Sequence, residues 1–229
     1  MTVVAAPTES LLVFSDVHLG SDLNDAGPVE ARSASIDRDL VRLVAHYRGQ
    51  AAPSGRWRII IAGDFIDLTG MVIDARGDEA SALATPLTDE ERRHGIGTAE
   101  DHARLKLRRV ARRHADVFAE LARFVSEGHA ITIISGNHDI ELHWDGVKEE
   151  LRSLLFQARP EHAPGDRDAF HARVEFAPLF YYRDGVIYVE HGHQYDPFCC
   201  TAMPIASSRR PARRPRRRCG WNCCRLARR

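Results

Sequence analysis

Hydrophobic and polar positions follow two different periods along this chain, and the switches between them outline an α/β protein. Four short apolar runs rich in β-branched residues each end in a cluster of polar side chains. They are LLVFSDVH at 11–18, IIIAGDFID at 59–67, ITIISGNHD at 131–139 and VIYVEHGH at 186–193. Such runs predict buried strands. Ligands of α/β sheets bind beyond the carboxyl ends of the strands, so we expect these four ends to converge on one site.

Between the runs, apolar residues recur at helical spacing. The expected segments are a helix from about 29 to 48, a short helix with a capping box at Thr88 and Glu91, one long helix from 98 to just before Gly128, and a shorter helix around 147–155. The succession of strand, helix and strand predicts parallel pairing of the first two strands.

Extended segments around 174–176 and 179–182 precede the last apolar run, with a turn at Asp184 and Gly185. Their succession predicts a second sheet. Residues 69–97 show only weak patterns and could form either a lid over the site or a long surface loop.

The amino-acid composition indicates which class of protein this is. The chain has 229 residues, of which 44% are hydrophobic and 28% charged, as in an ordinary soluble globular domain. No stretch approaches the roughly 18 consecutive apolar residues of a membrane span, and residues 1–14 lack the basic start of a signal peptide. We therefore expect a cytoplasmic enzyme.

The net charge of zero conceals an asymmetry. Residues 201–229 hold ten arginines and no acidic residue, so residues 1–200 carry 22 basic against 32 acidic side chains, a net charge of −10. All five cysteines lie at position 199 or later, and their odd number argues against a secreted disulfide framework. The chain thus consists of an acidic body and a basic tail.

The first two strand ends offer metal ligands. Asp16 and His18 are two residues apart, so their side chains would share one face of a continued strand. A carboxylate with an imidazole suits Mn, Fe, Zn or Co better than Ca or Mg. Asp64 follows Gly63, which permits close backbone approach, and its carboxylate could bridge two cations about 3.5 to 4 Å apart. The alternatives are a surface turn for Asp16 and His18, and a helix N-cap for Asp64.

The third strand end combines a ligand with a proton donor. Asn137 offers a neutral carbonyl oxygen to a metal. His138 could then act as a general acid toward a leaving alkoxide, with Asp139 orienting the imidazole. A turn followed by an N-cap is the alternative interpretation of these three residues.

The fourth strand end and the loop after the second strand add further polar residues. His191 at the fourth strand end is a further imidazole ligand. His193 could be a ligand, a substrate contact or a loop residue, and Asp67 is expected to support or cap rather than to bind metal. Together the four ends predict a metal site.

The four motifs, in this order, resemble those of a known family. Asp16-Val17-His18, the GDFID of residues 63–67, the GNHD of residues 136–139 and His191-Gly192-His193 resemble the DxH, GDxxD, GNH[DE] and HG motifs of calcineurin-like metallophosphoesterases. The resemblance covers about residues 11–197. It implies a four-layered α/β/β/α sandwich over residues 9–198, with a helical and loop insertion at 69–113.

The resemblance also implies a dinuclear centre that holds two divalent ions, with Mn, Fe or Zn expected. Asp16 and His18 would bind the first ion, Asp64 would bridge, Asn137 and His191 would bind the second, and His138 would be the catalytic acid. A metal-activated hydroxide would attack phosphorus in line with the leaving oxygen.

The implied substrate is a phosphorylated small molecule or a nucleotide-type compound with a phosphomonoester, phosphodiester or pyrophosphate bond. SDVHLG, GDFID and HGHQYD resemble the bacterial branch that includes UDP-2,3-diacylglucosamine hydrolases. That branch carries Arg where this chain has His138, which weakens a pyrophosphate assignment.

The chain departs from the family pattern after residue 198. The family's GHxH motif is missing, and the last histidine is His193. Each metal would lose one imidazole, so we expect weaker metal binding and reduced or absent activity. The tail, 199–229, is interpreted as out-of-frame or truncated translation, as a basic arm for nucleic acid or anionic lipid, or as a metal knuckle of Cys219, Cys223 and Cys224. The rival hypothesis is a catalytically inactive fragment whose arginine-rich tail binds nucleic acid or anionic surfaces.

Overall fold

A computed structural model describes residues 9–24, 32–161, 165–197 and 199. The chain divides into a first unit, residues 1–191, and a second unit, residues 192–229. In the described part of the second unit, the regular structure is one 3₁₀ turn, His193–Tyr195. The tail interpretations for residues 200–229 lie outside the described residues.

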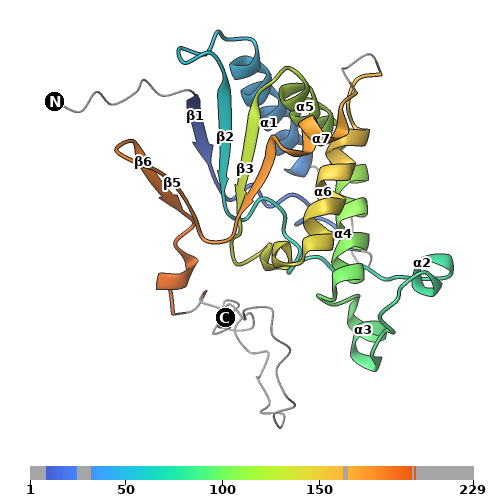
Figure 1. Cartoon of the computed structure of the whole chain (residues 1–229). Helices are drawn as coiled ribbons and strands as arrows, with labels where there is room; N and C mark the ends of the chain where they lie inside the picture. The colour runs from blue at the N-terminus through green and yellow to red at the C-terminus, as the bar shows by residue number, and fades with distance from the viewer. Residues whose placement is uncertain (1–8, 25–31, 162–164, 198, 200–229) are drawn as a thin grey trace. The chain divides into compact units, whose positions relative to one another are not determined.

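A parallel sheet of four strands in the order β1-β2-β3-β4 forms the centre of the first unit (Figure 1). Its strands are β1 Ser10–Phe14, β2 Trp57–Ala62, β3 Ala130–Ile134 and β4 Val174–Ala177. One row across the sheet pairs Leu12 with Ile59, Ile59 with Ile131, and Ile131 with Val174. Because the strands are parallel, the polar motifs that follow β1, β2 and β3 meet at one edge of the sheet.

Helices cover one face of this sheet (Figure 1). They are α1 Arg32–Arg48, α4 Glu100–Arg113, α5 Ala115–Ser126, α6 Asp145–Gln157 and α7 Arg167–His171. Two short helices, α2 Asp78–Ser81 and α3 Asp89–His94, lie away from the sheet, beyond α4 (Figure 1). The first predicted helix is confirmed over the part that is described, and so is the capping box of Thr88 and Glu91 at the start of α3. Within the described residues, no helix is both long and apolar enough to cross a membrane.

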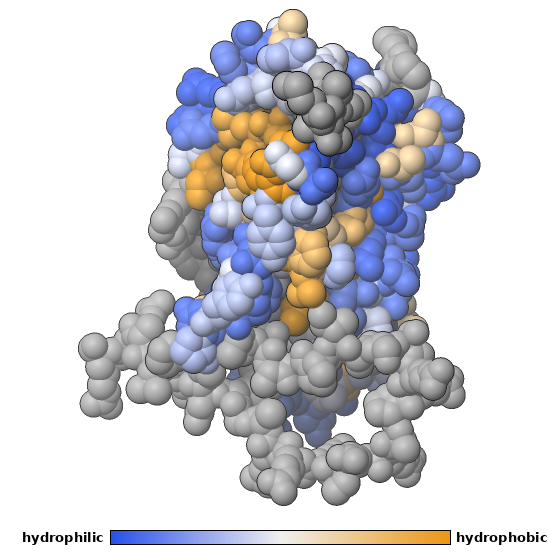
Figure 2. All heavy atoms as spheres, turned by 60° about the vertical axis from the view of Figure 1, so that its left-hand side comes forward, coloured by the Kyte–Doolittle hydropathy of each residue, from blue (hydrophilic) through white to orange (hydrophobic). Residues whose placement is uncertain are grey.

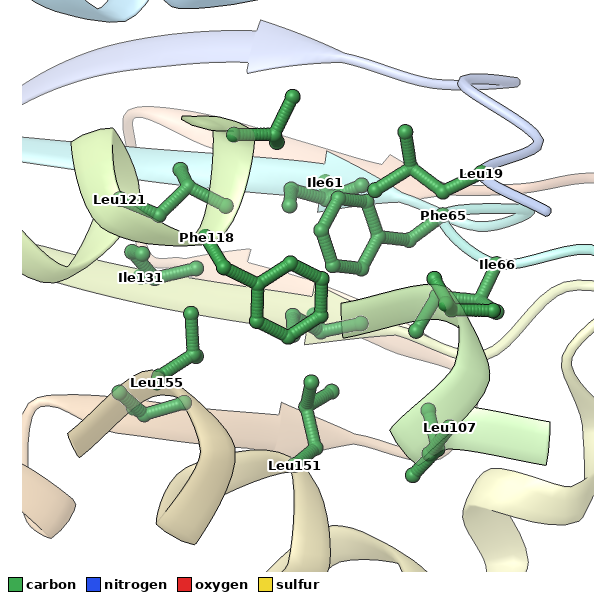
Figure 3. Close-up of a cluster of buried hydrophobic side chains, with 14 of the residues drawn as sticks. Leu19, Ile61, Phe65, Ile66, Leu107, Phe118, Leu121, Ile131, Leu151 and Leu155 are labelled. Carbon is green, nitrogen blue, oxygen red and sulfur yellow. The ribbon is translucent and has the colours of Figure 1, made fainter. Parts of the chain in front are cut away.

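The main core lies between these helices and the sheet. Alternate residues of a strand point to opposite faces, so Ile59 and Ile61 of β2 point toward the helices while Ile60 points away from them. Figure 3 shows Phe118 and Leu121 of α5 lying against this helix-facing side of the sheet. Burial of such apolar side chains is the main source of the fold's stability.

A two-stranded antiparallel hairpin packs on the other face of the sheet. It is formed by β5 Phe180–Arg183 and β6 Ile187–Glu190. Tyr181 and Val189 from the hairpin pack against the buried cluster of Ile60, Ala62 and Ile134. Helices, parallel sheet and hairpin give the mixed α/β fold expected from the sequence. The described residues contain no α-helix after β6, so the outer helical layer stays a prediction.

The hairpin side of the first unit exposes several large apolar side chains. Val13 of β1 and, on or beside the hairpin, Leu179, Phe180 and Val186 are exposed. Figure 2, in which this side comes forward, shows hydrophobic residues gathered at the surface. This face is therefore much less polar than the surface of an ordinary solvated sheet.

Two details of the predicted topology are wrong. The segment around residues 174–176 was expected in the second sheet, but β4 pairs in parallel with β3. The predicted long helix is interrupted at His114, where the backbone leaves helical geometry between α4 and α5. The buried ring of His114 accepts the N–H of Gly20 at Nε2 (3.0 Å) and is hydrogen-bonded through Nδ1 to Asp37 (2.7 Å). These tertiary bonds favour the break.

The arginines of α4 form ion pairs with acidic residues of other elements. Arg104 and Arg108 pair with Glu150 of α6. Arg109 pairs with Glu79, which links α4 to α2. The helix is thereby fixed to its neighbours.

Glu9 should be a strong electrostatic contributor to stability. Its buried carboxylate contacts Arg56, Arg58 and Arg183, with the Arg58 pair at 2.6 Å. Glu9→Gln leaves these guanidinium groups without their shared anion, and we expect a loss of about 3 kcal/mol in the free energy of unfolding. Urea unfolding measures this loss.

The stability lost in Glu9→Gln should depend on pH. Burial acts to raise the pKa of Glu9, but the hydrogen bond of Arg58 and the charges of the three arginines lower it below its ordinary value. Stability from an ionised Glu9 is therefore present above its unfolded pKa of about 4.3 and lost as the pH falls through the lowered folded value. The difference between wild type and Glu9→Gln should shrink below about pH 4. As a control, Asp145→Asn, at an exposed pair with Lys148, should leave the urea midpoint unchanged.

Candidate metal centre

The loops after β1 and β2 stay paired beyond the ends of their strands. The N–H of Asp16 donates to the carbonyl of Gly63 (3.2 Å), and the N–H of His18 donates to that of Asp64 (2.9 Å). Asp16, His18 and Asp64 have φ angles of +57°, +53° and +52°. Left-handed conformations cost a non-glycine residue about 1–2 kcal/mol, and such strain clusters at functional sites.

This geometry corrects the expectation that Asp16 and His18 share one face of a continued strand. Left-handed turns, and not an extended backbone, bring the two side chains near each other, with Nε2 of His18 3.9 Å from Oδ1 of Asp16. The predicted proximity is therefore present, but for a different reason.

Asp64 lies at the centre of the cluster. Its buried carboxylate oxygen Oδ2 is 3.6 Å from Nε2 of His18 and 3.4 Å from Nε2 of His191. Its other oxygen, Oδ1, accepts the backbone N–H of His138 at 2.9 Å. One carboxylate thus faces an imidazole from the β1 loop and an imidazole that follows β6, and it is also tied to the loop after β3.

Two glycines allow this close approach. A Cβ atom at Gly63 would overlap the imidazole of His191, and one at Gly136 would overlap the carboxylate of Asp64. Gly63 also has a φ of +90°, which favours glycine. The role expected for Gly63 from the sequence, close backbone approach at the site, is confirmed.

His191 and Asn137 direct acceptor atoms toward the same place. Nδ1 of His191 is 2.9 Å from the carbonyl oxygen of Ala62. A carbonyl can only accept, so in the neutral ring Nδ1 carries the proton and Nε2 carries a lone pair. Nε2 lies 3.1 Å from Oδ1 of Asn137 and close to Oδ2 of Asp64. Three acceptor atoms therefore converge, an arrangement that a bound cation would satisfy.

His138 is paired with Asp67. Nδ1 of His138 donates to Oδ1 of Asp67 at 2.7 Å, and the hydroxyl of Thr69 lies 3.3 Å from the same nitrogen. This hydrogen bond and the carboxylate charge raise the pKa of His138 despite its partial burial. Burial acts to raise the pKa of Asp67, but the hydrogen bond and charge of His138 lower it overall. The pair favours a charged imidazole with Nε2 directed away from Asp67.

Asp139 has a different place from the one expected. Its fully buried carboxylate accepts the N–H of Phe65 (2.9 Å) and that of Gly136 (2.6 Å), so it ties the loop after β2 to the loop after β3. Burial raises its pKa to about 6. The hydrogen bond to the ring of His138 that we expected from Asp139 is made by Asp67 instead.

The carboxylates and imidazoles form two groups in which one ligand atom per residue lies within 4.8 Å of the others. The groups are Asp16, Asp64 and His191, and His18, Asp67 and His138. The structure therefore brings together every residue expected to bind metal, with Asn137 joining through its contact with His191. His193 belongs to the second unit, so ligation by it stays a prediction.

Asp67 supports the site, as expected, but through a partner that the sequence did not identify. It holds the ring of His138, the contact expected from Asp139, and it also belongs to one of the two ligand groups. The available signal was its position as the second aspartate of GDFID, three residues after Asp64 on a loop that leads away from a buried strand.

Comparison with known proteins agrees with this geometry. The family model of calcineurin-like phosphoesterases matches residues 10–221, a range that includes the whole centre. Neither the curated proteins nor the solved structures gave a match. Members of this family hydrolyse phosphoesters with divalent metals, and the carboxylates and imidazoles described above are suitable ligands for such ions. The chain belongs to the calcineurin-like phosphoesterase family.

Proposed function

We propose that this chain hydrolyses a phosphomonoester, phosphodiester or pyrophosphate bond at the centre around Asp64. The observation that supports this most strongly is the position of the Asp64 carboxylate. Its Oδ2 faces Nε2 of both His18 and His191, while Oδ1 accepts the N–H of His138. This position supports a role for the carboxylate in bridging two cations, and the hydrogen bond ties it to the proposed proton donor.

Two divalent cations would bind at this centre, with Mn, Fe or Zn favoured by the mixture of oxygen and nitrogen ligands. Asp16 and His18 would hold one, Asn137 and His191 the other, and Asp64 both. When bound, such ions neutralise charge on a phosphoryl group and lower the pKa of water. This assignment gives each ion one imidazole ligand. We therefore expect activity to need excess metal.

The protein's own contribution to bond cleavage would come from His138. Its Nδ1 is held by Asp67, so Nε2 is the ring atom that can donate a proton to the leaving oxygen. Asp67 keeps the ring oriented and stabilises its charged form. The proton that leaves His138 ends on the alcohol product.

A comparison of leaving groups tests both the hydrolysis and the role of His138. We expect the wild-type chain with excess Mn²⁺ to hydrolyse p-nitrophenyl phosphate and phenyl phosphate, and to lose both activities in EDTA. His138→Gln should lower kcat for phenyl phosphate by about 10²-fold or more, and much less for p-nitrophenyl phosphate, because p-nitrophenolate leaves without protonation. Release of each phenol is followed by absorbance.

His143→Gln is the matched control, since His143 lies on the turn after the motif and bonds to the carbonyl of Ile140. It should leave both rates unchanged. Equal losses for the two esters in His138→Gln would contradict the role of proton donor. If the wild-type chain with excess Mn²⁺ hydrolyses neither these two esters nor bis(p-nitrophenyl) phosphate and ATP as diester and pyrophosphate probes, the proposed function fails.

A further inference from the structure

Behind the metal centre, α4 places a buried lysine against the loop that holds His138. Lys106 is 3% exposed, and its Nζ donates to the carbonyl of Leu68 at 2.8 Å. Leu68 lies between Asp67 and Thr69, and both of these residues contact His138. Lys106 thus holds the middle of the short segment that orients the proposed proton donor.

A second buried charge accompanies this lysine. Glu141 lies on the 3₁₀ turn Ile140–His143, directly after the GNHD motif, and is 1% exposed. Neither of its carboxylate oxygens has a hydrogen-bond partner in the described structure. Buried polar groups without partners are rare in proteins and need an explanation.

The charges of the two residues act on each other. Burial lowers the pKa of Lys106, whereas the charge of Glu141, followed by those of Asp67 and Glu91, acts to raise it. Burial likewise raises the pKa of Glu141, and the charge of Lys106 opposes that effect. Glu141 therefore offsets the cost of a buried ammonium group, in addition to Asp67.

The placement of the pair favours a role in the site over a simple role in the core. Lys106 is bonded to the Asp67–Thr69 segment, and Glu141 follows His138 by three residues. One partner of the Asp67–His138 hydrogen bond therefore lies on a segment that Lys106 holds, and the other lies three residues before Glu141. The arginines of α4 differ from Lys106, because they form ion pairs with acidic residues of α2 and α6 or, in Arg113, with Asp22 of the loop after β1.

We propose that Lys106 is a positioning residue for the proton donor: its hydrogen bond to Leu68 fixes Asp67 and Thr69, and through them the ring of His138. The proposal rests on the proposed function, because it assigns Lys106 to the same site. The structural part, the position of the His138 ring, can be measured without any activity.

A double-mutant design separates positioning from core stability. Lys106→Met alone leaves Glu141 buried without its cation and could unfold the chain. Lys106→Met combined with Glu141→Gln removes both charges, so neither buried charge is left alone. Glu141→Gln alone keeps the hydrogen bond from Lys106 to Leu68. Lys148→Met, which removes a partly exposed pair with Asp145 on α6, is the matched control.

The imidazole ¹⁵N resonances of the metal-free protein give the first measurement, at one fixed pH, with the His138 resonances identified by their loss in His138→Gln. We expect the double variant to keep the wild-type urea midpoint and yet to show displaced His138 resonances. Glu141→Gln and Lys148→Met should leave those resonances in place. Wild-type resonances in the folded double variant, or displaced ones in Glu141→Gln, would overturn the proposal. If neither Met variant of Lys106 folds, Glu141→Gln decides: unmoved resonances support the proposal and displaced ones overturn it.

Kinetics with excess Mn²⁺ give the second measurement. In the double variant, kcat should fall by about 10- to 100-fold, as when residues that support a metal or catalytic site are removed, with KM changed by less than about twofold. An unchanged kcat in a chain with displaced His138 resonances would overturn the catalytic consequence. If the wild-type chain has no activity, the proposed function fails while the resonances still decide the positioning role.

Discussion

Asp64→Asn should abolish phosphoester hydrolysis and leave the fold intact. Asn has the same shape, its Oδ1 can still accept the N–H of His138, and it tolerates the φ of +52° at this position well. It lacks the second anionic oxygen, which faces the imidazoles of His18 and His191. Loss of a bridging charge is worth several kcal/mol in the transition state, so we expect a fall in rate on the order of 10³-fold or more.

The same substitution should not destabilise the metal-free protein. Asp64 is buried near other acidic residues, and its charge is one of the causes that raise the pKa of Asp139. Removing a like charge relieves repulsion, so the urea midpoint should stay equal or rise. Asp184→Asn, at the exposed turn of the hairpin, is the matched control and should keep full activity. An Asp64→Asn variant that hydrolyses at the wild-type rate would contradict the central role of this carboxylate.

Gly63→Ala adds only one methyl group, but it should disturb the centre strongly. The new methyl group would overlap the imidazole of His191, which would have to move away from Asp64 and Asn137. We expect the Mn²⁺ concentration for half-maximal rate to rise by about 10- to 100-fold. Initial rates over a Mn²⁺ series measure this change.

Gly55→Ala controls for backbone strain. Gly55 has a φ of +91°, almost equal to the +90° of Gly63, but no atom within 4 Å would meet a Cβ there. Both variants should lose about 1–2 kcal/mol of stability from the left-handed conformation. Only Gly63→Ala should weaken the response to Mn²⁺. Equal responses in the two variants would show that strain, and not the contact with His191, explains the effect.

Strand ends carry strong local patterns, so the sequence predicted which side chains lie close together beyond them. Apolar runs that stop at polar residues identified β1, β2, β3 and the strand before His191, and the parallel pairing of β1 with β2 is confirmed. Once parallel strands are assumed, their carboxyl ends must meet, so Asp16, Asp64 and Asn137 had to be neighbours. The α/β class follows from the same pattern.

Local sequence patterns could not predict the features that depend on contacts between residues far apart in the chain. No glycine or proline marks the break at His114, and its causes lie 94 and 77 residues away, at Gly20 and Asp37. The left-handed turns at Asp16 and His18 are likewise held by hydrogen bonds to the β2 loop. The sequence does not distinguish Lys106 from the other basic residues of α4, since only the packed structure shows that it is buried.

Calorimetric titration of Mn²⁺ into the metal-free chain tests the proposed centre most directly, with Asp64→Asn titrated beside it. We expect wild type to bind two ions per chain, with hydrolysis of p-nitrophenyl phosphate rising over the same range of Mn²⁺ concentration. In Asp64→Asn, we expect both the binding heat and the hydrolysis to be lost. Equal Mn²⁺ binding by the two proteins, or full hydrolysis by the metal-free wild type, would contradict a metal centre built around Asp64.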